Sequence, residues 1–280
     1  MSSFSDIFEQ ISGNPDQHVR TGTEWKCWDA AAKKLIAQSF KANVTPVDFT
    51  PFGELNFPYI EMGSISSLDL FGTDELILFA FYKANTKTYK RVVDFGANIG
   101  LHSLILARCG FDVRSFEPDP WHIEKFRQNM AANKCVVDLH EAAISYQSGT
   151  AEFTRVLGNT TGSHLSGAKD NLYGDLERFA VQIEDAKPHL EWADLAKIDI
   201  EGHEAELFEN LPLSIWETTD AVAEIGTEKN AKLVYERFQG SNINLFAQKG
   251  NWGKVQHLSD LPTSHREGSV FISAKDSMPW

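Results

Sequence analysis

The stretch Arg91–Gly100 reads RVVDFGANIG, and it decides the fold class. Its first half is an apolar run that predicts a short buried strand from Arg91 to Phe95. Position 96 begins a glycine turn, and an apolar-periodic helix is expected to begin near Leu101. A strand, a glycine turn and a helix in this order form the opening unit of a doubly wound α/β sheet. The sequence therefore predicts that fold, with a ligand site at this turn.

The spacing of the turn indicates the kind of ligand. Gly96 can adopt a positive φ, and neither Gly96 nor Gly100 has a Cβ that would keep a ligand away. Asp94 can accept hydrogen bonds from a cationic or N–H-bearing ligand, and its charge opposes a phosphate. Asn98 stands where the dinucleotide fingerprint has its middle glycine. The spacing favours S-adenosylmethionine (SAM), which has no phosphate, while a tight turn without a ligand is the alternative.

A second signal lies about twenty residues further along the chain. Residues Val113–Phe116 predict a strand that ends at Glu117 and Pro118. An acidic residue at the end of the second strand can accept hydrogen bonds from both ribose hydroxyls of a nucleoside ligand. Asp119 is expected to cap the next helix, with Pro120 at its first position. A surface glutamate without a ligand is the alternative.

Three segments resemble the motifs of the FkbM-type SAM-dependent methyltransferases. They are VDFGANIG at 93–100, FEP at 116–118 and KIDIEGHE at 197–204, and the resemblance covers roughly residues 55–275. It implies a class I methyltransferase fold, which is a Rossmann-like, doubly wound, mostly parallel seven-stranded sheet. It also implies O-methyl transfer, often to a sugar hydroxyl of a glycan or to a secondary metabolite.

The chain is expected to consist of two parts. Residues 1–72 form an N-terminal extension that is helical or irregular, with a helix over 23–40, and pack on the main domain as a cap or as part of the acceptor site. Residues 73–280 form the methyltransferase domain. Thr73 is expected to cap the first helix of that domain.

The third strand, expected over 136–140, carries candidate adenine contacts. In a class I fold the end of this strand faces the adenine. Small Ala142 and Ala143 would let the base lie close, and Glu141 could accept from the exocyclic amine. An ordinary strand exit is the alternative. The polar loop at 158–164 is expected either to touch the cofactor or acceptor, or to be a solvated turn.

Candidate catalytic residues follow the fourth and fifth strands, where a doubly wound sheet has its ligand crevice. Asp199, Glu201 and His203 stand at alternate positions, so an extended segment would point them to one side. The fifth strand ends near Glu224. Methyl transfer to a hydroxyl requires in-line alignment and removal of one proton. His203, Asp199 or Glu201 could be the base.

Two alternatives to a base remain at this position. Asp199, Glu201 and Glu224 could hold a divalent cation that lowers the hydroxyl's pKa, although the pattern favours a base. Alternatively, Asp199 orders the methionine end of the cofactor, and Glu201 or His203 caps the next helix.

Composition limits the partners and the location. The formal net charge of −13 opposes tight binding to a nucleic-acid backbone, which needs clustered basic residues. A small-molecule or glycan acceptor with a hydroxyl is therefore expected. No apolar run approaches the ~18 residues of a membrane span, and residues 1–10 show no secretion signal, so a cytoplasmic location is expected. Three cysteines without C-x-x-C spacing favour reduced thiols.

Three other functions share parts of this pattern. An NAD-dependent reductase or epimerase would share Glu117 but would have glycine in place of Asn98. A nucleic-acid methyltransferase that methylates amines would follow the fourth strand with Asp or Asn, two prolines and an aromatic, whereas residues 199–202 read DIEG. A non-catalytic SAM-binding module would keep Asp94 and Glu117 without needing the third motif.

Overall fold

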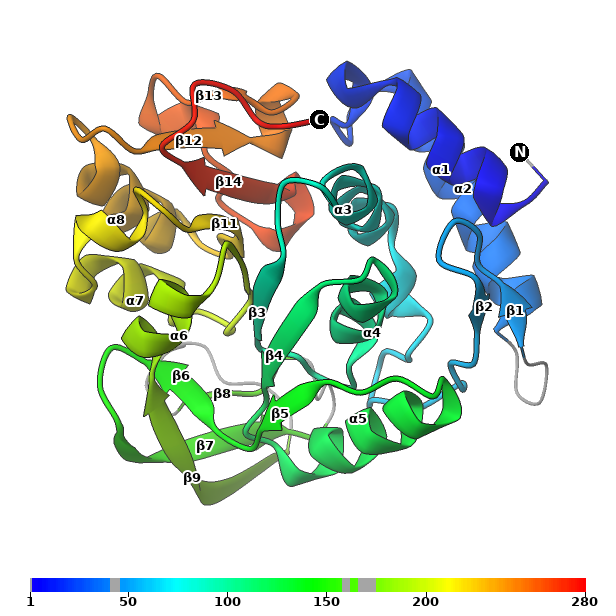
Figure 1. Ribbon diagram of the computed structural model, residues 1–280, viewed down its shortest axis with the longest axis horizontal. Helices are drawn as coiled ribbons and strands as arrows, with labels where there is room; N and C mark the ends of the chain where they lie inside the picture. Colours follow the sequence, from blue (N-terminus) through cyan, green and yellow to red (C-terminus); the bar gives the residue numbers. More distant parts are fainter. Residues whose placement is uncertain (1, 41–45, 158–161, 166–174) are drawn as a thin grey trace.

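An eight-stranded mixed sheet forms the centre of the computed structural model, which describes residues 2–40, 46–157, 162–165 and 175–280 (Figure 1). From edge to edge its strands are β13 (Gly253–Lys254), β12 (Asn244–Ala247), β14 (Ser269–Ser273), β11 (Asp220–Glu224), β10 (Leu195–Ile198), β3 (Arg91–Phe95), β4 (Asp112–Phe116) and β5 (Asp138–His140). The strands from β11 to β5 are parallel, and β14 runs antiparallel between β11 and β12. The chain thus winds outward from β3 in both directions, as predicted.

Helices cover both faces of this sheet (Figure 1). One face carries α3 (Thr73–Ala84), α4 (Leu101–Arg108) and α5 (Pro120–Ala132), and the other carries α6 (Ala186–Trp192), α7 (Glu204–Asn210) and α8 (Glu228–Phe238). Strand β3 reads as a continuous apolar run because both of its faces are buried. Its neighbouring residues Val92 and Val93 are fully buried in two different hydrophobic clusters, one on each face.

The elements around the glycine turn match their predictions closely. Strand β3 and helix α4 have the predicted bounds. Asp119 caps α5 by accepting from the backbone N–H of Trp121 at 2.8 Å, and Pro120 is the first helical residue. Thr73 is not a cap but the first residue of α3, and its Oγ1 donates to Asp29 Oδ1 at 3.1 Å.

The strand count differs from the expected seven. The described residues add β13 to the main sheet and form a second, four-stranded sheet in the order β6, β9, β7, β8. Its strands are β6 (Ala143–Ser145), β7 (Gly149–Val156), β8 (His164–Leu165) and β9 (Leu176–Asp185). The sequence does not show this second sheet, because alternation of apolar residues does not identify a strand's pairing partner. Strand β5 begins later than predicted, and Val136 before it is 94% exposed.

The extension packs against the first face of the main domain. It contains α1 (Phe4–Gly13), α2 (Thr23–Ser39), β1 (Val47–Asp48) and β2 (Glu54–Leu55), and its apolar side chains join the same hydrophobic cluster as α3 and α4. Short 3₁₀ helices occupy connections at η1 (Pro15–Gln17), η2 (Asp69–Phe71), η4 (Leu213–Ile215), η5 (Gln248–Gly250), η6 (Leu258–Asp260) and η7 (His265–Glu267). Within the described parts of the chain, every helix is too short or too polar to cross a membrane.

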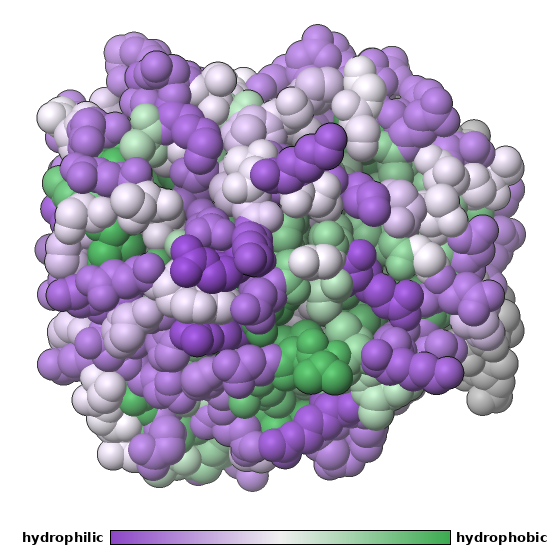
Figure 2. Space-filling model, viewed as in Figure 1, coloured by the Kyte–Doolittle hydropathy of each residue, from purple (hydrophilic) through white to green (hydrophobic). Residues whose placement is uncertain are grey.

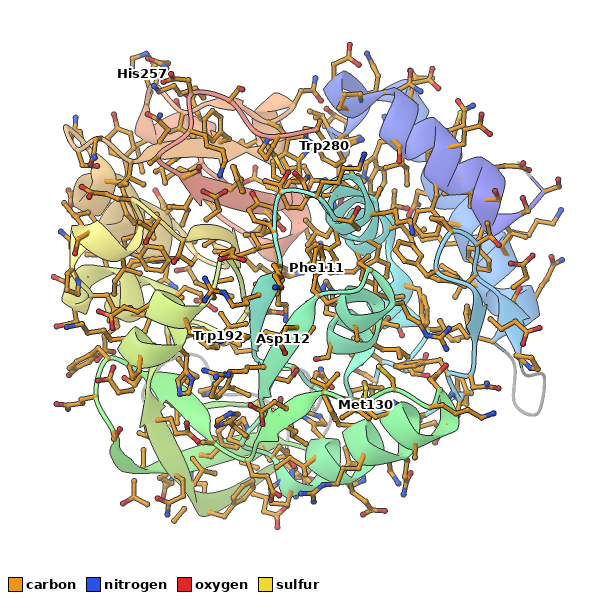
Figure 3. The ribbon with its side chains drawn as sticks, viewed as in Figure 1. Phe111, Asp112, Met130, Trp192, His257 and Trp280 are labelled. Atoms are coloured by element: carbon orange, nitrogen blue, oxygen red, sulfur yellow. The ribbon has the colours of Figure 1, made fainter. Side chains whose placement is uncertain are left out.

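A buried histidine fixes the extension to the C-terminal part of the chain. His18 Nε2 donates to Ile11 O at 3.0 Å, and His18 Nδ1 accepts from Trp252 Nε1 at 2.9 Å. The His18 ring also lies against Trp280, which Figure 3 shows near α3 and the C-terminal end of α1. Burial lowers the pKa of His18 to about 4, so the ring is neutral at pH 7 and can make both bonds.

Candidate functional site

A pocket lies at the carboxyl ends of β3, β4 and β10, where the winding direction of the sheet reverses. This is the position at which doubly wound sheets bind ligands. We call it the central pocket. It is lined by Gly96, Asn98, Phe116, Glu117, Pro118, His122, Ala142, Ala143, Ile144, Phe153, Ser163, His164, Leu165, Asp199, Ile200 and Glu201. The described part of the extension contributes none of these residues.

Every backbone N–H group of the turn at 96–100 donates to an acceptor within the protein. The bonds run from Gly96 and Ala97 to Phe116 O (3.1 and 2.9 Å), from Asn98 to Glu117 Oε2 (2.8 Å), from Ile99 to Asn98 Oδ1 (2.7 Å) and from Gly100 to Ala97 O (2.9 Å). Asn98 has a φ of 53°, a conformation that asparagine tolerates better than most residues. The turn is therefore held by internal bonds, and its amides are not free for a phosphate.

The two glycines serve packing more than ligand access. A Cβ at Gly96 would lie 1.8 Å from Asp199 O, and a Cβ at Gly100 would lie 2.6 Å from Phe126 Cδ2. Both glycines also have positive φ, 78° and 90° respectively. Gly96 lines the central pocket, but Gly100 does not. The absence of a side chain thus lets β3 approach the end of β10 and lets α4 approach α5.

Glu117 lies in the pocket wall and is only 4% exposed. Its carboxylate accepts from Asn98 N, from Asp119 N at 2.9 Å and from His122 Nδ1 at 3.3 Å. A carboxylate offers about four lone-pair positions, so roughly one remains for a ligand. Glu117 can therefore accept from both ribose hydroxyls, as predicted, only if the long hydrogen bond from His122 breaks.

His122 is a pocket residue that sequence reasoning missed. It is 3% exposed and lines the central pocket from the first turn of α5. Its Nε2 is buried and has no hydrogen-bond partner among the described residues. A buried ring nitrogen at a pocket wall can bind a ligand hydroxyl beside Glu117. The available signal was its place one helical turn beyond the acidic end of β4.

Asp94 lies beneath the pocket, not in its wall. It is fully buried and accepts from Ser103 Oγ at 2.6 Å. Its Oδ1 lies 3.3 Å from Lys197 Nζ, close enough for an ion pair but without the alignment of a hydrogen bond. Lys197 also donates to Gly96 O at 2.9 Å and lies 3.6 Å from Asp199 Oδ2. Asp94 therefore acts on the pocket through Lys197.

Lys197 is the second residue whose role the sequence did not reveal, although it opens the third motif. Burial lowers its pKa, but Asp94, Asp199 and Glu75 raise it more, so the pKa lies above the usual range of a lysine. The ammonium group therefore stays charged between the ends of β3 and β10. It neutralises carboxylates that would otherwise repel one another.

Only some of the residues that follow the third strand lie where a contact with the adenine was predicted. Ala142 and Ala143 line the central pocket, and Ala142 is 2% exposed. Glu141 lies outside the lining, its side chain is half exposed, and it pairs with Arg127. The expected contact between Glu141 and an adenine amine is thus not supported by its position. Of the polar loop, positions 163 and 164 line the pocket, and 158–161 lie outside the described residues.

A second pocket, which we call the acidic pocket, adjoins the central one and shares Asp199 and Glu201 with it. Both remaining candidates, His203 and Glu224, line it as well. The expected extended geometry is wrong, because β10 ends at Ile198 and the chain turns where Glu201 has a φ of 56°. The four candidates nevertheless meet, because the turn and the end of β11 face the same space.

Burial sets the protonation of this pocket. It raises the pKa of Glu224 well above the usual range, with help from the charges of Asp199 and Glu201. Burial also lowers the pKa of His203, against an opposing effect of Glu206, so the imidazole is neutral. His203 Nε2 lies 3.0 Å from Ser145 Oγ, and its Nδ1 lies 3.2 Å from Glu206 Oε2.

Glu204 supports the turn between the two pockets, and sequence reasoning gave it no role. It is 2% exposed and accepts from the backbone N–H groups of Ile200 and Gly202, at 2.9 and 3.0 Å. Burial raises the pKa of Glu204 to about 7, with a further contribution from Asp199, although the backbone bonds lower it.

The candidate cation ligands are not assembled as a set. Across the described ranges, the ligand atoms of Asp199, Glu201 and Glu224 do not gather within 4.8 Å of one another. The group that does gather is His140, Glu184 and His189, which belongs to neither pocket.

Comparison with proteins of known function finds a methyltransferase, sdnD of Sordaria araneosa, that is 30% identical over 170 aligned positions. The alignment takes in 48% of this chain and 65% of the relative, so the chain spans less than two thirds of that protein's length. No model of a known protein family matches the chain, and the resemblance to the FkbM family stays a prediction.

Solved structures with some similarity include three chains. StiE O-MT (residues 942–1257) has a TM-score of 0.37 and 11% identity, covering 62% of this chain and 54% of that one. Precorrin-6y C5,15-methyltransferase of Geobacter metallireducens has a TM-score of 0.37 and 12% identity, and the match covers 83% of this chain and 97% of that one. A SAM-dependent methyltransferase of Agrobacterium tumefaciens has a TM-score of 0.34 and 11% identity, and the match covers 72% of this chain and 63% of that one.

Proposed function

We propose that this protein is a SAM-dependent methyltransferase and that the central pocket binds SAM. The turn at 96–100 carries the proposal, because all five of its N–H groups already donate within the protein. A dinucleotide pyrophosphate is held by such a turn and by the helix N-terminus that follows it. Occupied turn amides favour a ligand without phosphate, as SAM is. The similarity to the methyltransferase sdnD supports the same activity.

The pocket offers suitable groups for each part of SAM. Ala142, Ala143 and neighbouring apolar side chains suit the adenine, since they present a low-relief apolar wall. Glu117 and His122 are placed for the ribose hydroxyls. Asp199 is the carboxylate for the cationic amino end, and its pairing with Lys197 orients it.

The acidic pocket is the proposed site of the methyl acceptor. When bound, SAM supplies a methyl group on a sulfonium centre. The chain must place the acceptor oxygen in line with that group and remove its proton. Asp199 and Glu201 line both pockets, so they mark the junction across which the methyl group would pass.

We assign His203 as the base. Its Nε2 lies 3.0 Å from the hydroxyl of Ser145, and its Nδ1 lies 3.2 Å from Glu206, close enough for an electrostatic interaction but without a hydrogen bond. An acceptor hydroxyl that replaced the Ser145 hydroxyl would donate to the same nitrogen. A neutral imidazole within reach of a hydroxyl is the arrangement that general-base catalysis requires. Glu224 is less suited to this role, because burial and the neighbouring charges raise its pKa.

The acceptor is proposed to be an uncharged hydroxyl compound, such as a sugar or a secondary metabolite. Carboxylates dominate the acidic pocket, where they are contributed by Asp199, Glu201, Glu204, Glu206, Glu209 and Glu224. Together with the net charge of −13, they disfavour anionic acceptors. Figure 2 also shows that hydrophilic residues predominate on the face in view.

The test is release of S-adenosylhomocysteine from SAM in the presence of a panel of sugars and phenolic or aliphatic alcohols. We expect turnover with an uncharged hydroxyl compound, and a loss of about 10²–10⁴ in rate for His203→Ala. Tight SAM binding without turnover of any acceptor would favour a non-catalytic binding module. Turnover confined to nucleic acid would contradict the proposed acceptor.

A further inference from the structure

Two histidines and a glutamate from separate parts of the fold converge outside both pockets. His140 ends edge strand β5 of the main sheet, Glu184 lies in β9 of the second sheet, and His189 lies in α6. His140 Nδ1 is 3.1 Å from both carboxylate oxygens of Glu184, and His189 Nε2 is 3.0 Å from Glu184 Oε2. One atom from each residue thus lies within 4.8 Å of the others, which is metal-ligand spacing.

If both imidazoles of this cluster are neutral, they do not have enough N–H groups to donate to every carboxylate that faces them. His140 faces carboxylates on both sides, because its Nε2 lies 3.4 Å from Asp138 Oδ2. A neutral imidazole has one N–H, so one of its nitrogens must turn a lone pair toward a carboxylate. A metal ion on Nδ1 would remove this conflict and leave Nε2–H facing Asp138. A carboxylate behind a metal-bound histidine is a common supporting arrangement.

The rings are also held in place. Phe116 stacks on His140 with ring centroids 4.4 Å apart, and it meets His189 edge-on at 4.6 Å. His140 Nε2 and His189 Nδ1 are buried and have no hydrogen-bond partner in the described ranges. Packing therefore holds two imidazoles toward one carboxylate, and the unpartnered nitrogen of each ring is the one that does not face Glu184. A site built this way needs little rearrangement to bind an ion.

We propose that His140, Glu184 and His189 bind one divalent transition-metal ion, with Zn²⁺ as the best match to two imidazoles and one carboxylate. Water would complete the four-coordinate shell. The ion would tie the edge of the main sheet, the second sheet and α6 together behind Phe116, which lines the central pocket. This role is structural and does not depend on the proposed methyl transfer.

The test uses the full chain after treatment with a chelator and dialysis. Zn²⁺ is titrated in competition with a chromophoric chelator, and Co²⁺ is added separately to record its visible spectrum. We expect one equivalent of Zn²⁺ per chain, a tetrahedral Co²⁺ absorption band and a higher Tm with Zn²⁺. Glu184→Gln and His189→Gln should each weaken Zn²⁺ binding at least ~100-fold, since even supporting residues contribute 10- to 100-fold.

Two exposed residues provide matched controls. Glu191→Gln removes a carboxylate from the same helix as His189, and His257→Gln removes a histidine at a remote edge of the molecule (Figure 3). Both should bind Zn²⁺ as the wild type does. Circular dichroism checks folding, and His140→Gln replaces either site variant that does not fold. Wild-type protein that takes up no stoichiometric Zn²⁺, or folded site variants that bind it unchanged, would overturn the proposal.

Discussion

The backbone N–H of Asn98 donates to Oε2 of Glu117 across 2.8 Å, and this bond joins two motifs that are 19 residues apart in the sequence. Glu117 therefore has two roles, because the same carboxylate that faces the pocket also accepts a backbone hydrogen bond from the glycine turn. The bond also consumes an amide that a dinucleotide site would use for its phosphates. The bonding of the turn's own backbone therefore disfavours a dinucleotide at this position.

Replacing Glu117 should affect both roles. Glu117→Ala should weaken SAM binding by about 1.5–3 kcal/mol, the usual contribution of hydrogen bonds to a charged group, and should lower Tm because the turn loses an acceptor. Calorimetry and thermal unfolding measure the two effects. Glu141→Ala is the control, since Glu141 is half exposed and outside the pocket lining. An equal loss of affinity in both variants would contradict the placement of the cofactor.

Gly96 should not tolerate a side chain. Gly96→Ala would place a Cβ 1.8 Å from Asp199 O at a φ of 78°, so the end of β3 must separate from β10. We expect destabilisation of at least ~1–3 kcal/mol in urea unfolding, together with a large loss of SAM affinity. Gly149→Ala is the matched control, because a Cβ there has open space around it. Native stability and affinity in Gly96→Ala would refute the packing role.

His203 should control the rate without controlling cofactor binding. His203→Ala should lower turnover by about 10²–10⁴ and leave SAM affinity nearly unchanged. Burial lowers the pKa of His203, so wild-type activity should fall on acidification at a pH below the ordinary histidine value of ~6.5. His257→Ala, at an exposed position, is the control. Full turnover in His203→Ala would show that the base lies elsewhere, with Glu201 the next candidate.

Glu204 should make stability depend on pH. The pKa of Glu204 in the folded state, about 7, exceeds its ordinary value of 4.5. Its contribution to the stability of the folded state is therefore complete below pH 4.5 and is lost as the pH rises through 7. Glu204→Gln should remove this dependence. The difference in free energy of unfolding between the variant and the wild type should shift in favour of the variant by on the order of 3 kcal/mol from pH 4.5 to pH 8.5, as measured by urea unfolding. A stability difference that is the same at both pH values would contradict the buried, protonated state.

The sequence predicted well wherever the determinant was local. The bounds of β3 and α4, the Asp119 cap and the acidic end of β4 all follow from spacing, glycine and proline positions within a few residues. The meeting of Asp199 and Glu224 follows from the rule that parallel strands end at one edge of a sheet.

Features that depend on distant contacts could not be predicted in the same way. Gly100 is needed because Phe126 packs against it, and Glu141 faces solvent because the pairing of β5 and its exit turn it outward. Lys197 gains its role only when β3 and β10 lie side by side. Glu184 meets His140 only through the second sheet, whose pairing leaves no periodic signal in the sequence.

Calorimetric titration of the purified chain with SAM, S-adenosylhomocysteine and NAD⁺ tests the central claim most directly. We expect SAM and S-adenosylhomocysteine each to bind at one site per chain, and NAD⁺ to give no saturable heat, because the turn at 96–100 has no free amide for its phosphates. Saturable binding of NAD⁺, with none of SAM or S-adenosylhomocysteine, would contradict the assignment of the central pocket.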